Sequence, residues 1–210
     1  MAYYGQTYQT GADPWQLFAN WALLIIPWVL IAKFPPLSML WIVLVNLALT
    51  LYLDLHRSVF GFWLFREVDL YFLLFLINGL FLVAWELTAK KHTEYRSRWA
   101  PRMIATSVGS FITTFTCFFI IDLKTELAHA MAFYPLWLFL MYRTYRKQQV
   151  DMFMLAGVSL SIIVVVGTLL TRLLIETLEF NGFILIAIVL MLLTSKLASW
   201  LRRVQKETMQ

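Results

Sequence analysis

Residues 68–87 read VDLYFLLFLINGLFLVAWEL, and this stretch decides the class of protein. Its charged residues, Asp69 and Glu86, lie near its two ends, and one amide, Asn78, lies near its middle. A helix of roughly 20 apolar residues spans the hydrocarbon core of a bilayer, which is about 30 Å thick. The stretch therefore predicts a transmembrane helix with a polar side chain near mid-membrane depth.

The composition of the whole chain agrees with a membrane setting. Hydrophobic residues make up 61% of the 210 residues and charged residues only 14%, whereas soluble domains carry about 25% charged residues. The single cysteine, Cys117, lies inside an apolar run, which excludes an intrachain disulfide framework and a cysteine-based metal site. We expect one transmembrane domain over residues 1–210, with no cofactor and no metal.

Further apolar runs of similar length give seven predicted spans. Backbone polar groups in lipid must be paired within the chain, and continuous runs satisfy this as helices, whereas barrel strands would alternate in hydropathy. The expected fold is all-α, a multi-pass transmembrane bundle of about seven helices. The spans are expected at residues 16–33, 37–54, 68–87, 101–121, 126–142, 152–174 and 181–200.

The Lys and Arg residues predict the orientation of these spans. Of the 17 cations, four belong to one side of the membrane, namely Arg57, Arg66, Lys124 and Arg172. The remaining thirteen of the 17 belong to the other side, and they are Lys33, Lys90, Lys91, Arg96, Arg98, Arg102, Arg143, Arg146, Lys147, Lys196, Arg202, Arg203 and Lys206. The positive-inside rule then puts the N-terminus outside and the C-terminus in the cytoplasm. This topology accounts for the basic excess, so the expected partner is the lipid bilayer and not a nucleic acid.

Residues 5–30, GQTYQTGADPWQLFANWALLIIPWVL, join a polar turn to an apolar helix. The segment resembles the bacterial predicted membrane proteins that carry domain of unknown function 2157, and the likeness is dense over about 50 residues. The positions that match the turn motif of that family are Gly5, Gln6, Tyr8, Gln9, Gly11, Asp13 and Trp15.

This resemblance implies an integral protein of the bacterial inner (cytoplasmic) membrane. It implies that the chain corresponds to the C-terminal portion of longer family members, in which further helices precede the motif. The N-terminal helices absent here, or another membrane protein, are then expected to complete the bundle. The family has no established activity, so the resemblance implies none.

Five polar residues are candidates for a functional site within or beside the membrane. Asn20, Asn46 and Asn78 each lie in one of the first three spans, where an amide needs a hydrogen-bond partner. Glu126 and His129 lie three residues apart at the outer end of the fifth span, where they could share a proton or a cation. The asparagines either line a polar path or bond helices together, and we expect the second.

The fourth span carries hydroxyl residues at a helical spacing. Thr106, Ser110 and Thr114 recur every four residues and so share one face, and Gly157 with Ser161 makes a similar pair in the sixth span. Small residues at this spacing allow close helix packing, while their hydroxyls could also line a wet path. We expect packing.

No catalytic motif is recognisable, so we expect no enzymatic activity and no catalytic residues. The function expected first is a non-enzymatic membrane scaffold or assembly component. The alternative is a subunit of a transporter or channel for a small polar solute or ion. The sequence leaves open the substrate, the partner and the oligomeric state, and also whether the chain is a fragment of a longer protein.

Overall fold

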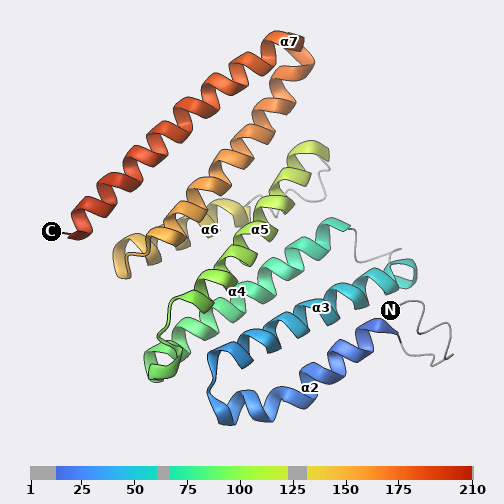
Figure 1. Cartoon of the computed structure of the whole chain (residues 1–210). Coiled ribbons are helices and arrows are strands. Elements are labelled where there is room, and N and C mark those ends of the chain that lie inside the picture. Colours follow the sequence, from blue (N-terminus) through green and yellow to red (C-terminus); the bar gives the residue numbers. More distant parts are fainter. Residues whose placement is uncertain (1–12, 61–66, 123–131, 210) are drawn as a thin grey trace. The chain divides into compact units, whose positions relative to one another are not determined.

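The computed structural model describes residues 13–60, 67–122 and 132–209. The expectation of an all-α fold is confirmed, and the described residues contain no strand. The chain divides into two compact units, residues 1–101 and 102–210, with the division near the start of one helix. Each unit is described separately below (Figure 1).

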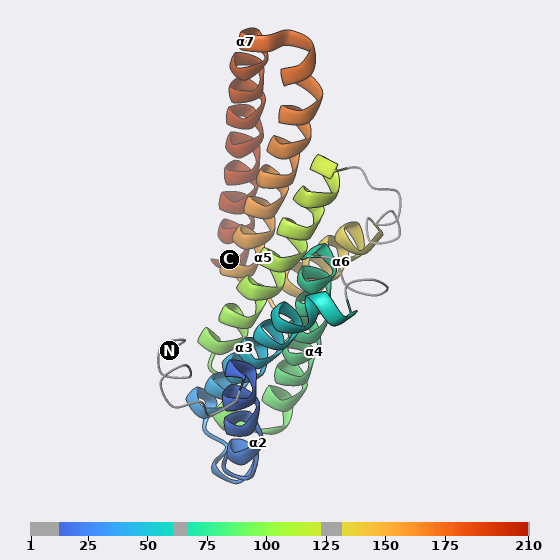
Figure 2. The same cartoon turned by 90° about the vertical axis from the view of Figure 1, so that its right-hand side faces the viewer.

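The first unit begins with three long helices that follow one another in the chain. They are α2 (Pro14–Ala32), α3 (Pro35–Phe60) and α4 (Glu67–Lys91), and a 3-10 turn, η1 (Thr93–Tyr95), follows α4. α2 lies beside α3, and α3 lies beside α4, in both views of the molecule (Figures 1 and 2). Each helix covers one of the first three predicted spans, with ends that differ by a few residues.

Trp41 joins the three helices of the first unit. Its indole Nε1 on α3 donates a hydrogen bond to the carbonyl oxygen of Ala22 on α2, at 3.0 Å. Its ring meets the Phe81 ring on α4 edge to face, with centroids 5.5 Å apart. Trp15 and Tyr52 form a second edge-to-face pair between α2 and α3, with centroids 4.9 Å apart. Such aromatic pairs contribute about 0.5–1.5 kcal/mol beyond their buried area.

The turn between α2 and α3 is very short. α2 ends at Ala32, and the next residue, Lys33, has a φ of 47° in the left-handed region. Pro35 begins α3 two residues after Lys33. A left-handed residue followed by proline is a common way to end a helix, because proline cannot continue it. α2 is thereby folded back against α3.

The second unit contains the rest of the helices. α5 (Trp99–Asp122) starts at the division between the units, and it is followed by α6 (Phe133–Tyr142), a π-helical turn η3 (Arg143–Gln148) and α7 (Met152–Met209). α7 is assigned as helix throughout its 58 residues, yet it turns back on itself between two arms that run side by side (Figures 1 and 2). These arms contain the sixth and seventh predicted spans.

The two arms of α7 pack against each other at Gly167. A Cβ atom added there would lie 3.5 Å from Cδ1 of Leu190, on the other arm. Near the ends of the arms, the Tyr142 ring of α6 stacks on Trp200 of the second arm, with centroids 6.3 Å apart. These contacts hold α6 and both arms in one unit.

Six segments of the described residues are long and apolar enough to cross a membrane. They are Pro14–Ala32, Pro35–Leu55, Leu70–Lys91, Trp99–Ile121, Met152–Leu174 and Gly182–Thr208. The described part of the fifth predicted span is α6, which has only 10 residues and is not among the six. Residues 126–131 of that span, including Glu126 and His129, lie outside the described residues.

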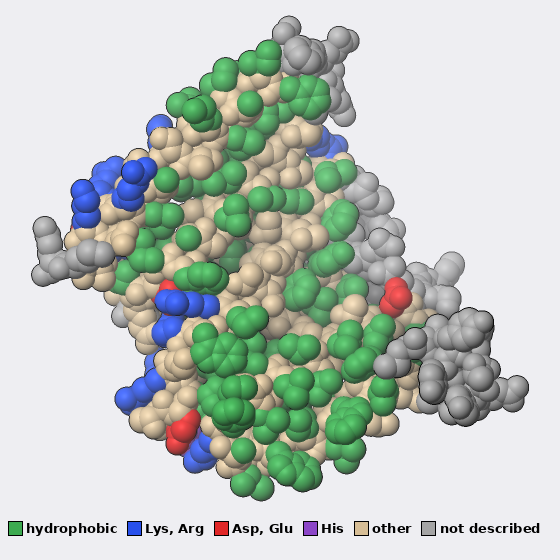
Figure 3. All heavy atoms as spheres, in the orientation of Figure 1, with side chains coloured by type: hydrophobic (Ala, Val, Ile, Leu, Met, Phe, Trp, Pro, Cys, Tyr) green, Lys and Arg blue, Asp and Glu red, His purple; other side chains and the backbone are tan. Residues whose placement is uncertain are grey.

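Apolar side chains are spread widely over the face of the described helices that Figure 3 shows. On α2, Trp21, Leu24, Trp28 and Ile31 are between 57% and 81% exposed, and Ala22 is the residue of that helix that is buried. Such a surface would be unstable in water but suits hydrocarbon, since lipid tails are as apolar as leucine. The fold is therefore that of an integral membrane protein.

Candidate functional site

Asn46 and Asn78 face each other between α3 and α4. Nδ2 of Asn78 donates to Oδ1 of Asn46 at 2.6 Å, and Nδ2 of Asn46 donates to Oδ1 of Asn78 at 3.1 Å. Each Nδ2 also donates, at 2.8 Å, to the carbonyl oxygen four residues earlier in its own helix, which is Ile42 or Leu74. A backbone carbonyl oxygen can accept a hydrogen bond from the amide nitrogen but not from the amide oxygen. The bonds to Ile42 and Leu74 therefore fix which end of each side-chain amide is nitrogen.

This arrangement uses both hydrogens of each amide nitrogen and leaves each amide oxygen bonded to the other side chain. Asn78 is only 2% exposed. A buried amide without partners would cost several kcal/mol in hydrocarbon, so the reciprocal bonding is what allows two asparagines in adjacent apolar helices. We call these two residues the amide pair.

Of the other sequence candidates, the structure describes Asn20, which does not join the amide pair. Asn20 is exposed on α2, and Glu126 and His129 lie outside the described residues, as do Gly5, Gln6, Tyr8, Gln9 and Gly11 of the family motif. Asp13 precedes the first residue of α2, and Trp15 packs on Tyr52. Of the motif positions that the structure describes, Asp13 therefore lies at the start of α2 and Trp15 packs α2 against α3.

The second unit contains a cavity of about 500 Å³ between α5, α6 and the first arm of α7. The predicted hydroxyl stripe lines it, since Thr106, Ser110 and Thr114 are among its walls, together with Gly157 and Ser161 from α7. The small residues of α5 thus border open space as well as packing surfaces. Among the described residues that line this cavity there is no Asp, Glu, Lys, Arg or His.

A chain of hydroxyl groups lies at one wall of the cavity. Oγ1 of Thr113 donates to the carbonyl oxygen of Gly109 at 2.6 Å and lies 2.6 Å from Oγ of Ser161, which lies 3.1 Å from the hydroxyl oxygen of Tyr134. Each hydroxyl has one hydrogen. Because Thr113 gives its hydrogen to Gly109, Ser161 donates to Thr113 and Tyr134 donates to Ser161. The hydroxyl hydrogens of Thr113, Ser161 and Tyr134 are therefore all donated within this series of hydrogen bonds.

Trp137 of α6 lines the same cavity and has an unused donor. Its side chain is only 6% exposed, and its indole Nε1 has no hydrogen-bond partner among the described residues. The sequence reasoning missed this residue. Its signal in the sequence is weak, because a tryptophan in an apolar run is ordinary in a membrane helix.

The start of α7 is held by a charged residue that the sequence reasoning also did not single out. Asp151 precedes the first residue of α7, and its Oδ1 accepts a hydrogen bond from the backbone N–H of Phe153 at 3.1 Å. Its Oδ2 lies 3.2 Å from Nε of Arg102 on α5, and its side chain is 4% exposed. An aspartate directly before an apolar helix is a recognisable N-cap signal.

Cationic side chains gather at one end within each unit. In the first unit, η1 lies beside the start of α3, because Ser38 Oγ and the Tyr95 hydroxyl are 3.0 Å apart, and Arg98 pairs with Glu86 at 3.0 Å. Lys33, Lys90 and Lys91 lie at this same end, in the turn after α2 and in the last turn of α4.

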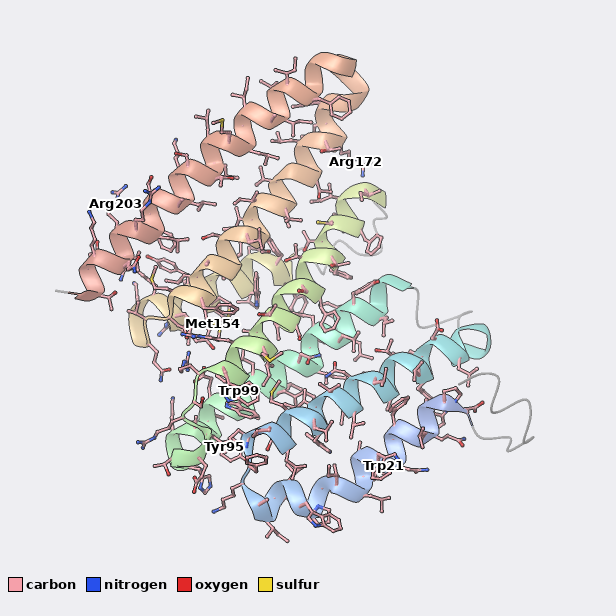
Figure 4. The ribbon with its side chains drawn as sticks, in the orientation of Figure 1. Trp21, Tyr95, Trp99, Met154, Arg172 and Arg203 are labelled. Atoms are coloured by element: carbon pink, nitrogen blue, oxygen red, sulfur yellow. The ribbon has the colours of Figure 1, made fainter. Side chains whose placement is uncertain are left out.

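In the second unit, Arg146 pairs with Glu207 and so brings η3 to the end of the second arm of α7. Arg172 lies at the other end of the first arm, where its guanidinium donates to the carbonyl oxygens of Ile120 and Ile121 in the last turn of α5. Figure 4 labels Arg172 on the first arm of α7 and Arg203 near the C-terminal end of the second arm. A cation on the last carbonyls of a helix satisfies groups that have no partner within the helix.

Metal ligands are not clustered in the part of the chain that the structure describes. No group of three or more His, Cys, Asp or Glu side chains there could hold a metal ion. Cys117 is a free thiol, and its Sγ accepts a hydrogen bond from Thr168 Oγ1 at 3.3 Å. In the described residues, the polar groups of the amide pair and of the cavity lining are therefore neutral amide, hydroxyl and indole groups.

Comparison with known proteins gives one match. Residues 1–38 match the model of a family described as predicted membrane protein (DUF2157). Comparison with curated proteins and with solved structures gives no significant match. The match is shorter than the stretch of about 50 residues over which the sequence resembles the family, and it does not extend to the later helices or to a C-terminal portion of the family. Residues 1–38 are thus similar to the DUF2157 family of predicted membrane proteins, and the chain is an integral multi-pass membrane protein.

Proposed function

We propose that this protein is a non-enzymatic scaffold or assembly component of the bacterial cytoplasmic membrane. Its N-terminus lies outside and its C-terminus lies in the cytoplasm. The lipid bilayer and another membrane protein are its partners. The gathering of cations at one end within each unit supports this orientation, because cytoplasmic segments carry an excess of Lys and Arg.

The observation that carries the proposal is the closed bonding of the amide pair. Asn46 and Asn78 are the residues of the first unit best placed to bind a polar solute at mid-membrane depth. Their amide hydrogens are instead given to each other and to the backbone. A group that binds a solute must exchange these bonds, whereas a group that joins helices keeps them. The amide pair therefore supports a role in holding helices together.

The test replaces the amide pair with apolar side chains of similar size in the double variant Asn46→Leu/Asn78→Leu. An interhelical hydrogen bond in a membrane protein contributes about 0.6–2 kcal/mol, so the variant is expected to lose stability and to keep its function. Two measurements are made at matched protein levels in membranes. The first is the size of the native assembly on a native gel, and the second is solute entry into proteoliposomes, followed by swelling in glycerol and in potassium salts.

For a scaffold, the wild type migrates as an assembly larger than its 24.6 kDa chain, and the double variant migrates alike. Proteoliposomes of both swell no faster than protein-free liposomes. The variant Asn20→Leu is the matched control, because Asn20 is exposed and lies outside the amide pair. The proposal would be overturned if wild-type proteoliposomes took up solute faster than protein-free liposomes, the double variant lost this uptake, and Asn20→Leu retained it. That result would favour the transporter or channel subunit.

A further inference from the structure

Asn20 is a polar side chain on the outer face of a membrane helix. It is exposed on α2, and its amide makes no hydrogen bond with another described residue. Asn46 and Asn78 differ from it in this respect, because they bond each other and the backbone. Of the three asparagines that the sequence singles out in the first spans, Asn20 is thus the one whose amide has no partner in the part of the chain that the structure describes.

The depth of Asn20 in the membrane follows from the charged residues at the two ends of α2. Asp13 precedes the helix and Lys33 follows it, with 19 residues between them, and this length of about 28 Å matches a hydrocarbon core of about 30 Å. Asn20 is seven residues beyond Asp13, so it lies roughly 10 Å inside the core. Its short side chain cannot return the amide to the interface. Because an amide without a partner is costly in hydrocarbon, Asn20 needs a polar group that the described residues do not supply.

The exposed residues above and below Asn20 form a stripe along α2. They recur at alternating steps of three and four residues, which is the heptad spacing of a contact seam between two helices. The residues of this α2 stripe, all of them exposed, are Leu17, Asn20, Leu24, Pro27 and Ile31. α2 is an edge helix of the first unit and lies beside α3 (Figure 1). The α2 stripe is therefore a helix-contact seam that the described helices of its own unit do not use.

A second copy of the chain can supply the group that Asn20 needs, in the way that the amide pair demonstrates. Asn46 and Asn78 lie on adjacent helices, and each donates to the amide oxygen of the other, at 3.1 Å and 2.6 Å. Such bonding is reciprocal because each amide carries both a donor and an acceptor. A two-fold axis beside α2 would place the Asn20 side chains of two copies opposite each other, and two-fold dimers, in which the same patch meets itself, are the commonest homo-oligomers.

We propose that the α2 stripe is a self-association surface on which Asn20 exchanges hydrogen bonds with Asn20 of a second copy of this chain. The apolar residues of the stripe then pack on the same residues of the other copy. This inference rests on the proposed scaffold function and names one partner in the assembly. A different membrane protein on the stripe is the competing outcome of the test.

The first measurement is the affinity of self-association in liposomes. Copies of the full chain carry a donor or an acceptor fluorescent protein after Gln210, and energy transfer between them is followed as added lipid dilutes the protein. Asn20→Leu is expected to raise the dissociation constant about threefold to thirtyfold, as for one interhelical hydrogen bond. Asn20→Gln keeps an amide and is expected to keep the wild-type affinity. Asn46→Leu/Asn78→Leu is the matched control, because it removes amides that lie outside the α2 stripe.

The second measurement is cysteine cross-linking in native membranes, which tests the face of α2 that meets the other copy. Leu24→Cys and Leu30→Cys replace residues of similar exposure, 65% and 69%, but position 30 lies about 120° away from position 24 around the helix. Both are made with Cys117→Ser, so that each chain has one thiol. Oxidation is expected to convert Leu24→Cys to a band at twice 24.6 kDa and to leave Leu30→Cys at the single-chain size. Adding Asn20→Leu to Leu24→Cys should weaken that band.

Equal affinities of the wild type and Asn20→Leu, or equal cross-linking of Leu24→Cys and Leu30→Cys, would overturn the inference and leave the scaffold function standing. A native assembly larger than the single chain without energy transfer between copies would also overturn it, and would assign the stripe to a different membrane protein. The scaffold function fails on a separate result, which is solute entry that is lost with the amide pair. The two proposals can therefore fail independently.

Discussion

Asp151 combines two roles in one carboxylate at the start of α7. One oxygen caps the first turn of the helix, and the other pairs with Arg102, whose guanidinium carbon also lies 5.7 Å from the centroid of the Phe153 ring. The carboxylate is almost fully buried, where a charge is costly unless it is paired and hydrogen-bonded. At the residue scale, this side chain connects α5 to α7 within the second unit.

We predict that Asp151→Ala lowers the free energy of unfolding more than Asp151→Asn does. The asparagine can still cap the helix and loses mainly the ion pair, at about 1 kcal/mol, whereas the alanine loses both and should cost about 2–3 kcal/mol. Reversible unfolding in detergent micelles measures the difference. Glu207→Gln is the control, because Glu207 is 57% exposed in its pair with Arg146 and should change stability little. Equal losses in the two Asp151 variants would contradict the capping role.

At the scale of elements, the arms of α7 depend on a close approach at Gly167. No Pro or Gly interrupts residues 174–181, and the assigned helix continues through them. Gly182 follows this stretch directly, and the return of the second arm along the first brings Leu190 to Gly167. Leu190 of the second arm occupies the space that a side chain at position 167 would need.

We predict that Gly167→Ala is tolerated and that Gly167→Leu is destabilising. A Cβ atom at 3.5 Å from Leu190 is an ordinary van der Waals contact, but a full leucine must push the arms apart, at a cost of about 1–3 kcal/mol. Thermal unfolding of the purified protein measures both variants. The same change at Gly79, where a Cβ atom has no neighbour within 4 Å, should cost much less. Similar losses at Gly79 and Gly167 would show that the two arms do not pack closely.

At the scale of the whole molecule, charge rather than packing determines the direction in which the chain crosses the membrane. Thirteen of the 17 Lys and Arg residues belong to the side that we assign to the cytoplasm. Loops near the ends of membrane helices that are rich in Lys and Arg stay in the cytoplasm during insertion. The gathering of Lys33, Lys90 and Lys91 at one end of the first unit fits this assignment.

We predict that green fluorescent protein fused after Gln210 is fluorescent and that alkaline phosphatase fused there is inactive, because the proposed topology puts the C-terminus in the cytoplasm. Fusions placed between residues 61 and 66 should behave in the opposite way. Whole-cell fluorescence and phosphatase activity measure the two sets, with immunoblots to match protein levels. The reverse pattern at both positions would invert the proposed topology.

The sequence by itself determined the class of protein, the all-α fold and the approximate limits of most spans. These properties follow from local quantities, namely the length of each apolar run and the pairing of backbone groups that lipid demands. They hold whatever neighbours a helix has, which is why α2, α3, α4 and α5 each overlap one predicted span, with ends one to six residues away from its limits.

The tertiary structure decided which polar groups meet. Asn46 and Asn78 are 32 residues apart, and each was recognisable as an amide that needs a partner, but Asn20 satisfied the same criterion and lies exposed instead. The difference depends on how each helix is rotated about its axis and on which helix lies beside it. The position of Trp137 beside a cavity has the same origin, because open space is a property of three packed helices and of no single run of residues.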